Sequence, residues 1–170
     1  MKNRLSKSRL ELLSAALTNP RTVKRYQSLI STGTTAAGCR VWTGAISGKG
    51  QGRFWVGTLP DGRDLVMIAH RFGYAHLHGI KHLDDANVLR HICDEPSCQN
   101  PDHWIPGTIH ENTLEWSERR HTIGSPLRDK RGARGRAIAL REAALQGEDL
   151  DLAAAAGSPL GDQLQDPLFG

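Results

Sequence analysis

Hydrophobic residues recur at helical spacing near the start of the chain. Leu13 and Leu17 follow this period and predict an amphipathic helix over residues 6–17, which ends before an Asn-Pro pair. A second helix is expected over residues 20–30, with Tyr26 on its inner face. Both segments are basic on their outer faces, so they predict either a phosphate-contacting arm or a solubilising helical pair.

Strand-like patterns follow a linker of serine, threonine, glycine and alanine at residues 31–38. Residues 39–44 and 48–56 lie on either side of a glycine-rich turn and predict a β-hairpin. A short apolar strand is expected at residues 65–69. The hydrophobic period then changes to that of a helix, which Gly79 ends.

A strand, a second strand and a helix are predicted in the middle of the chain. The strands cover residues 88–92 and 104–106, and the helix covers residues 109–120 with Thr108 as its N-cap. Trp116, on this helix, is expected to pack in the core. This order of elements sets two strands and one helix around a single loop.

The last fifty residues have a different character. Helices are predicted over residues 134–146 and 149–156, and residues 157–170 lack periodicity and predict a flexible tail. A basic run precedes and enters these helices and predicts either contacts to a DNA backbone or a disordered arm. It comprises Arg119, Arg120, His121, Arg128, Lys130, Arg131, Arg134 and Arg136.

Metal-binding residue types gather in the loop between the two central strands. Cys93, Cys98 and His103 fall at C-x4-C-x4-H spacing, which allows three ligands to converge on one tetrahedral ion. Cys39 is the remaining cysteine, and as a remote fourth thiolate it would complete a Cys3His zinc site; the alternative is a buried free thiol. Three cysteines argue against a closed disulfide framework and for a reducing compartment.

Two further residues near this loop need a role outside the same ion. His91 lies near the end of the first predicted strand, two positions before the first loop cysteine, and Asn112 lies at the start of the following helix. If these residues have no functional role, His91 would be a hydrogen-bonded histidine of the core and Asn112 would be an amide that caps the helix.

The order and spacing of these residues resemble the motif of the HNH or His-Me finger endonucleases, which have the ββα-metal fold. The resemblance is closest to the zinc-containing His-Cys box branch of that family. The resemblance implies an α+β fold: a ββα-metal core with an upstream β-hairpin, a structural zinc, and helical N- and C-terminal extensions. It implies a metal-dependent DNA endonuclease of phage or mobile-element type. The matching residues are His91, Cys93, Cys98, Asn100, Pro101, His103 and Asn112.

The resemblance also implies a role for each site residue. His91 would be the general base, Asn112 would hold Mg2+, which Mn2+ can replace, and Arg53 would steady the scissile phosphate. Many HNH enzymes place an aspartate directly before the base histidine, where this chain has Arg90. Either the metal is held through Asn112 alone, or its affinity is weak. Packing or DNA-facing roles, rather than metal ligation, are implied for His70, His76, His78 and His82.

Charge and composition favour a nucleic-acid partner without proving one. Lysine and arginine exceed aspartate and glutamate by 22 to 18, a net charge of +4, and basic residues crowd the start of the chain. Double-stranded DNA is the expected partner, with a homodimer suspected. No 18-residue apolar stretch exists, so we expect no membrane span and a location in the cytoplasm of a bacterial host.

The organisation predicted for the chain has four parts: an N-terminal extension at residues 1–30, a nuclease domain at 39–121, a helical appendage at 122–156, and the tail. The appendage could bind DNA or form a dimerisation arm. Gln165, Leu168 and Phe169 in the tail resemble the pentapeptide that binds the bacterial sliding clamp. The alternative functions are a zinc-stabilised DNA-binding module without catalysis and a structural interaction protein.

Overall fold

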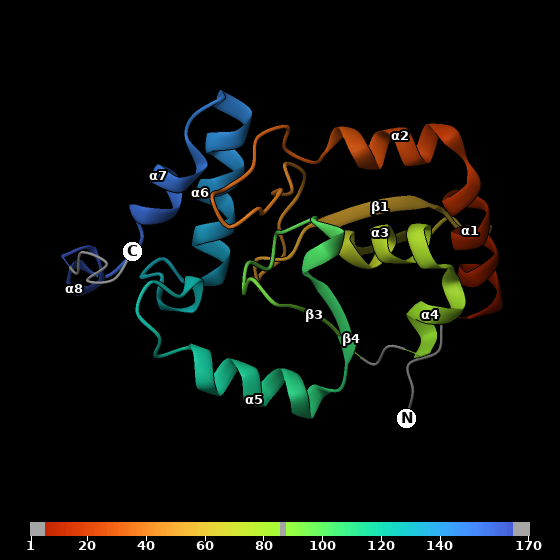
Figure 1. Ribbon diagram of the computed structural model, residues 1–170. Coiled ribbons are helices and arrows are strands. Elements are labelled where there is room, and N and C mark those ends of the chain that lie inside the picture. The colour runs from red at the N-terminus through yellow and green to blue at the C-terminus, as the bar shows by residue number, and fades with distance from the viewer. Residues whose placement is uncertain (1–5, 86–87, 165–170) are drawn as a thin grey trace.

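Two small antiparallel sheets and a set of short helices make up a mixed α+β structure (Figure 1). The computed structural model describes residues 6–85 and 88–164. The elements are α1 (Lys7–Thr18), α2 (Pro20–Ser28), β1 (Arg53–Thr58), β2 (Asp64–Ile68), α3 (Ala69–His78), α4 (Ile80–Asp85), β3 (Val88–His91), η1 (Pro101–His103), β4 (Trp104–Gly107), α5 (Ile109–Arg119), η2 (Pro126–Arg128), α6 (Gly132–Gln146), α7 (Leu150–Ala155) and α8 (Leu160–Gln163).

The first two helices meet at one residue that ends α1 and begins α2. Asn19 accepts hydrogen bonds at its side chain from the backbone N–H groups of Arg21 and Thr22, at 2.9 and 3.3 Å, and proline follows it at the first helical position. The helices predicted over residues 6–17 and 20–30 are therefore confirmed to within two residues at each end.

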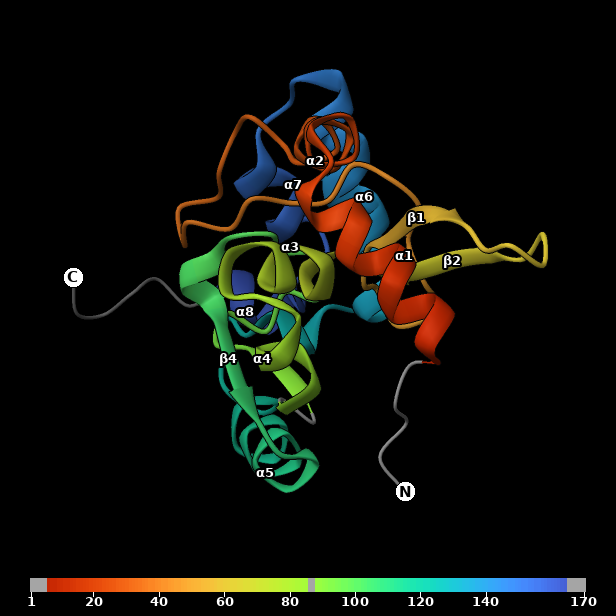
Figure 2. The same cartoon turned by 90° about the vertical axis from the view of Figure 1, so that its right-hand side faces the viewer.

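The hairpin predicted from residues 39–44 and 48–56 is wrong in its pairing. β1 pairs with β2, with Arg53 opposite Ile68, and the two strands project from the molecule (Figure 2). Residues 39–44 instead cross to the loop after β3, where Val41 forms an antiparallel bridge with Cys98. The pairing differs because the backbone of this stretch is bonded elsewhere: the N–H of Ser31 donates to the carbonyl of Val41 at 2.9 Å, and the N–H of Trp42 donates to the carbonyl of Ser97 at 3.0 Å.

An aromatic cluster forms the main core between the helices and both sheets. Tyr26, Trp42, Phe54 and Phe72 pack with ring centroids 4.6–5.9 Å apart. A second, smaller core joins the C-terminal helices to the middle of the chain, because Val41 packs against three buried residues. These are Leu140, Ala143 and Leu150.

The β3–β4 hairpin and α5 follow one another as predicted. The hairpin runs from Val88 opposite Gly107 to His91 opposite Trp104. Thr108 caps α5, and its side chain accepts from the backbone N–H of Glu111 in a capping box.

The expectation that Trp116 packs in the core is wrong. Its side chain is 46% exposed, and the guanidinium of Arg120 stacks on its ring at 4.5 Å. No residue of α5 is buried, and the helix lies along one edge of the molecule (Figure 1). α5 instead docks through polar contacts, since Arg119 donates to the carbonyl of Ile92 at 3.1 Å.

The C-terminal region is more ordered than predicted. The basic run is not a disordered arm: it extends from the end of α5 through η2 into α6. Four of its arginines pair with acidic residues of this chain: Arg119, Arg128, Arg131 and Arg136. Part of the predicted flexible tail is also ordered, because α8 lies within it and Asp162 pairs with Arg128 at 2.7 Å. Within the described ranges, no helix combines the length and apolar character needed to cross a bilayer.

Candidate metal centre and adjoining cavity

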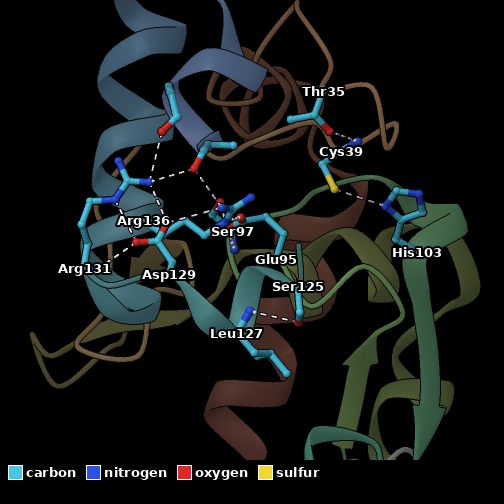
Figure 3. Close-up of polar contacts among 12 residues, drawn as sticks. Thr35, Cys39, Glu95, Ser97, His103, Ser125, Leu127, Asp129, Arg131 and Arg136 are labelled. Carbon is cyan, nitrogen blue, oxygen red and sulfur yellow. Dashed lines mark hydrogen bonds and ion pairs between the residues drawn. The ribbon is translucent and has the colours of Figure 1, made fainter. Parts of the chain in front are cut away.

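Three cysteines and one histidine converge from distant parts of the chain. The ligand atoms of Cys39, Cys93, Cys98 and His103 all lie within 4.8 Å of one another. The Nδ1 atom of His103 is 3.7 Å from the Sγ of Cys39 (Figure 3). The same nitrogen is 3.5 Å from the Sγ of Cys98. Three thiols and an imidazole at this spacing are the donor set of a closed tetrahedral site, so the cluster could hold a metal such as zinc.

Backbone and amide contacts bring Cys39 to the other three ligands. Asn100 donates from Nδ2 to the carbonyl of Gly38 at 2.9 Å, while its Oδ1 accepts from the N–H of Asp102 at the start of η1. Gln99 donates from its backbone to the carbonyl of Arg40 at 2.6 Å. One short turn therefore fixes the remote cysteine beside the loop cysteines, and the predicted fourth ligand is in place.

The thiols of the cluster interact strongly with one another. Hydrogen bonds from Cys93 and Cys98 lower the pKa of Cys39 to about 2, and the same interaction raises the pKa of Cys93 to about 12. The pKa of Cys98 is raised as well. A thiolate in this cluster is therefore stabilised by hydrogen bonds from the neighbouring thiols.

A buried ion-pair network supports the loop between Cys93 and Cys98 from outside. Glu95 lies in this loop and is 1% exposed, and the Nε of Arg136 on α6 donates to its Oε2 at 2.7 Å. The same guanidinium lies 3.4 Å from Asp129, which Arg131 also pairs with (Figure 3). The C-terminal helices are thus joined to the metal-binding loop by charge.

The ring of His91 is held by the same loop. Its Nε2 lies 3.0 Å from the backbone carbonyl of Cys98, and the Nε1 of Trp104 donates to that carbonyl at 3.2 Å. Because a carbonyl only accepts, Nε2 of His91 carries the proton, which leaves Nδ1 as the acceptor nitrogen of the neutral ring. Burial lowers the pKa of His91 to about 4, so the ring is neutral at pH 7.

A second histidine, for which the resemblance implied a packing or DNA-facing role, packs against this ring. His70 on α3 is buried, and its ring meets that of His91 edge-to-face with centroids 4.4 Å apart. Burial lowers the pKa of His70 well below its usual value. The available signal was a histidine directly after a strand, at the first turn of a helix, which is too common a pattern to identify this contact.

His91 and Asn112 line the same cavity, of about 190 Å³, between β3 and α5. Asp94 and Arg119 also line it, and the Nη2 of Arg119 lies 3.2 Å from the Oδ1 of Asp94. Gln51 closes one side. The two residues that the sequence set apart from the metal cluster are therefore brought together at one concave site.

Other predicted site residues lie elsewhere. Arg53, the first residue of β1, is exposed and is not among the residues that line this cavity. Arg90 lines it, but its guanidinium is paired with Glu115 on α5. The clamp-like residues lie outside the described part of the chain, and their role stays a prediction; they are Gln165, Leu168 and Phe169.

The protein thus has an α+β fold with a Cys3His cluster beside a histidine-containing cavity. It is similar to two proteins of Escherichia phage T7: protein 7.7, 33% identical over 93 residues, and protein 2.8, 32% identical over 81 residues. These matches cover 54% and 48% of this chain and 65% and 50% of the relatives, so the chain spans less than two thirds of either. No protein-family model and no solved structure matches. The similarity supports the predicted phage origin.

Proposed function

We propose that this protein is a divalent-metal-dependent DNA endonuclease of the HNH, or His-Me finger, class. The observation that carries the proposal is the hydrogen bond from the Nε2 of His91 to the carbonyl of Cys98, which leaves Nδ1 as the acceptor nitrogen of a ring that lines the same cavity as Asn112. A fixed imidazole with one acceptor nitrogen is what a general base requires. β3, β4 and α5 follow one another along the chain, and residues of β3 and α5 line this cavity, which supports the assignment to that class.

The chemistry follows from the residues on the two sides of the cavity. His91 accepts a proton at Nδ1 from the water that attacks phosphorus, and the bond to the 3′ oxygen breaks. The leaving 3′ oxygen takes a proton from solvent water, so the products are a 5′ phosphate and a 3′ hydroxyl. The side-chain oxygen of Asn112 suits a hard cation such as Mg2+. When bound there, that ion would neutralise charge on the phosphate and the leaving oxygen. The Cys98 carbonyl holds the neutral imidazole in the tautomer whose Nδ1 can accept this proton.

The Cys3His cluster is proposed to hold a structural zinc ion. Its donor set fits the ion, and its position explains why a small protein would use one, because the loop that it closes carries the carbonyl bound to His91. The zinc would therefore act on catalysis through geometry, and not through contact with DNA.

A plasmid-nicking assay tests the proposal. Supercoiled plasmid is incubated with Mg2+ and zinc-loaded protein, either wild type or with His91→Ala, Asn112→Ala or, as a matched control, His82→Ala, which removes an exposed histidine of α4. Loss of a general base should slow nicking by about 100-fold or more while DNA binding persists, and the control should nick normally. Equal nicking by wild type and His91→Ala would exclude His91 as the base.

A zinc-stabilised DNA-binding module without catalysis is the second candidate. It is favoured by the position of Arg53 outside the cavity and by the pairing of Arg90 with Glu115, which together leave Asn112 as the assigned metal ligand. Filter binding against a heparin-blocked control would then show DNA affinity, with no nicking in Mg2+ or Mn2+ by any variant.

A further inference from the structure

One carboxylate in the cavity has no role in the mechanism proposed above. Asp94 is the sole acidic residue among the described residues that line the cavity, and its side chain is 13% exposed. Its backbone φ is 55°, the left-handed region, and no other non-glycine residue in the described part of the chain has a positive φ. Such conformations cost free energy in L-residues and concentrate at functional sites.

The contacts of Asp94 leave part of its carboxylate available. The Nη2 of Arg119 meets Oδ1 at 3.2 Å, and the same guanidinium is also held by Glu115 and by the carbonyl of Ile92. The loop after β3 thus turns Asp94 back toward α5, the helix that carries Asn112. Oδ2 is left for a further partner.

We infer that Asp94 is a second protein ligand, with Asn112, for the divalent ion of this site. The inference rests on the proposed function and deepens it. Mg2+ binds proteins through one or two carboxylates and keeps several waters, so an amide oxygen alone makes a weak site. The residue directly before His91 cannot supply the carboxylate, because it is Arg90. Asp94 supplies it from three positions after His91, in the same cavity.

A purely structural ion pair between Asp94 and Arg119 is the competing explanation, and the chain offers a matched control. Glu115 pairs with the same guanidinium, with its Oε2 3.1 Å from Nη2, yet is not among the residues lining the cavity. Asp94→Asn and Glu115→Gln each remove one carboxylate from Arg119. Asparagine also adopts positive φ readily, so Asp94→Asn keeps the loop conformation and a side-chain oxygen beside Arg119.

The test measures metal binding directly. Full-length, zinc-loaded His91→Ala protein, which should not cut DNA, is mixed with a short duplex and titrated with Mn2+, and the free ion is followed by electron paramagnetic resonance. The titration is repeated with Asp94→Asn, Glu115→Gln or Asn112→Ala added. Asp94→Asn should weaken Mn2+ binding by about 10–100-fold, the range seen when residues around a metal are altered. Glu115→Gln should leave binding unchanged.

The outcomes separate the two proposals. If Asn112→Ala weakens Mn2+ binding and Asp94→Asn does not, Asp94 is not a ligand while the nuclease proposal stands. Equal weakening by Asp94→Asn and Glu115→Gln would assign the effect to Arg119 and overturn the inference. If none of the three variants alters Mn2+ binding, both the inference and the metal site proposed for the nuclease fail. In nicking assays with His91 intact, extra Mn2+ should restore the activity of Asp94→Asn.

Discussion

Replacing Arg136 by methionine tests how the C-terminal helices support the metal-binding loop. The Nε of Arg136 lies 2.7 Å from Glu95 and its Nη1 lies 3.4 Å from Asp129, and the three side chains are 12%, 2% and 1% exposed. Methionine keeps most of the apolar stem and removes the charge. The perturbation therefore leaves Glu95 buried beside the cluster without its cation.

The expected loss of stability depends on whether Glu95 stays charged without its partner or becomes protonated. Leaving one partner of a buried ion pair unpaired destabilises proteins by about 3–5 kcal/mol. The carboxylate can instead take up a proton, which for a glutamate of ordinary pKa costs about 3.7 kcal/mol at pH 7, at 1.36 kcal/mol per pKa unit. Protonation therefore limits what Glu95 can contribute, and we expect Arg136→Met to lower the free energy of unfolding by about 3–4 kcal/mol.

Urea unfolding at a fixed concentration of free zinc provides the assay. Arg134→Met is the control, because Arg134 is exposed on the same helix, and it should change stability by less than about 0.5 kcal/mol. Adding Glu95→Gln to Arg136→Met should recover much of the lost stability, since the buried charge of Glu95 is then removed together with its cation. The reasoning is refuted if Arg136→Met behaves like Arg134→Met, or if the second substitution deepens the loss.

Three further predictions concern the metal, acid pH and the core. Removing zinc with a chelator should abolish nicking and weaken the fold, and added zinc should restore both; nicking that survives metal-free preparation would contradict this. Burial alone would raise the pKa of Asp129, but hydrogen bonds from Arg131 and its charge hold it below the usual value, so its stabilisation is lost as pH falls below about 4. In urea unfolding, Asp129→Asn should therefore lose less stability relative to wild type as the pH falls below about 4. A stability loss that does not change with pH would contradict this role of the Asp129 carboxylate. Gly73→Ala would place a methyl group against Tyr26 and Trp104 and should destabilise by about 1–3 kcal/mol, whereas an unaltered melting temperature would show that this core relaxes freely.

Features set by local chemistry were predictable from the sequence. Asn19 followed by proline marks the junction of α1 and α2, and Thr108 with Glu111 three positions later marks the start of α5. The spacing of Cys93, Cys98 and His103 likewise places three ligands in the one loop between β3 and β4. In each case the determining contacts lie within a few residues of one another.

Features set by distant partners were missed. The glycine-rich turn indicated a hairpin, but β1 pairs with the later β2 because Val41 is taken up by its bridge to Cys98. The spacing of Trp116 is typical of a core residue, yet α5 docks by arginine contacts and leaves the ring exposed. Arg136 belongs to a basic run that indicated a DNA contact, and only the structure brings Glu95 to it.

The Cys98 residue joins the two halves of the proposed site. Its thiol belongs to the metal cluster, while its carbonyl accepts from both His91 and Trp104. A backbone carbonyl that accepts two hydrogen bonds has no further lone pair for water, so the orientation of the His91 ring depends on where this one peptide lies. Movement of the loop on metal loss would therefore release the imidazole even where the aromatic core stays folded. It follows that loss of metal should reduce nicking before it reduces the signal of the core.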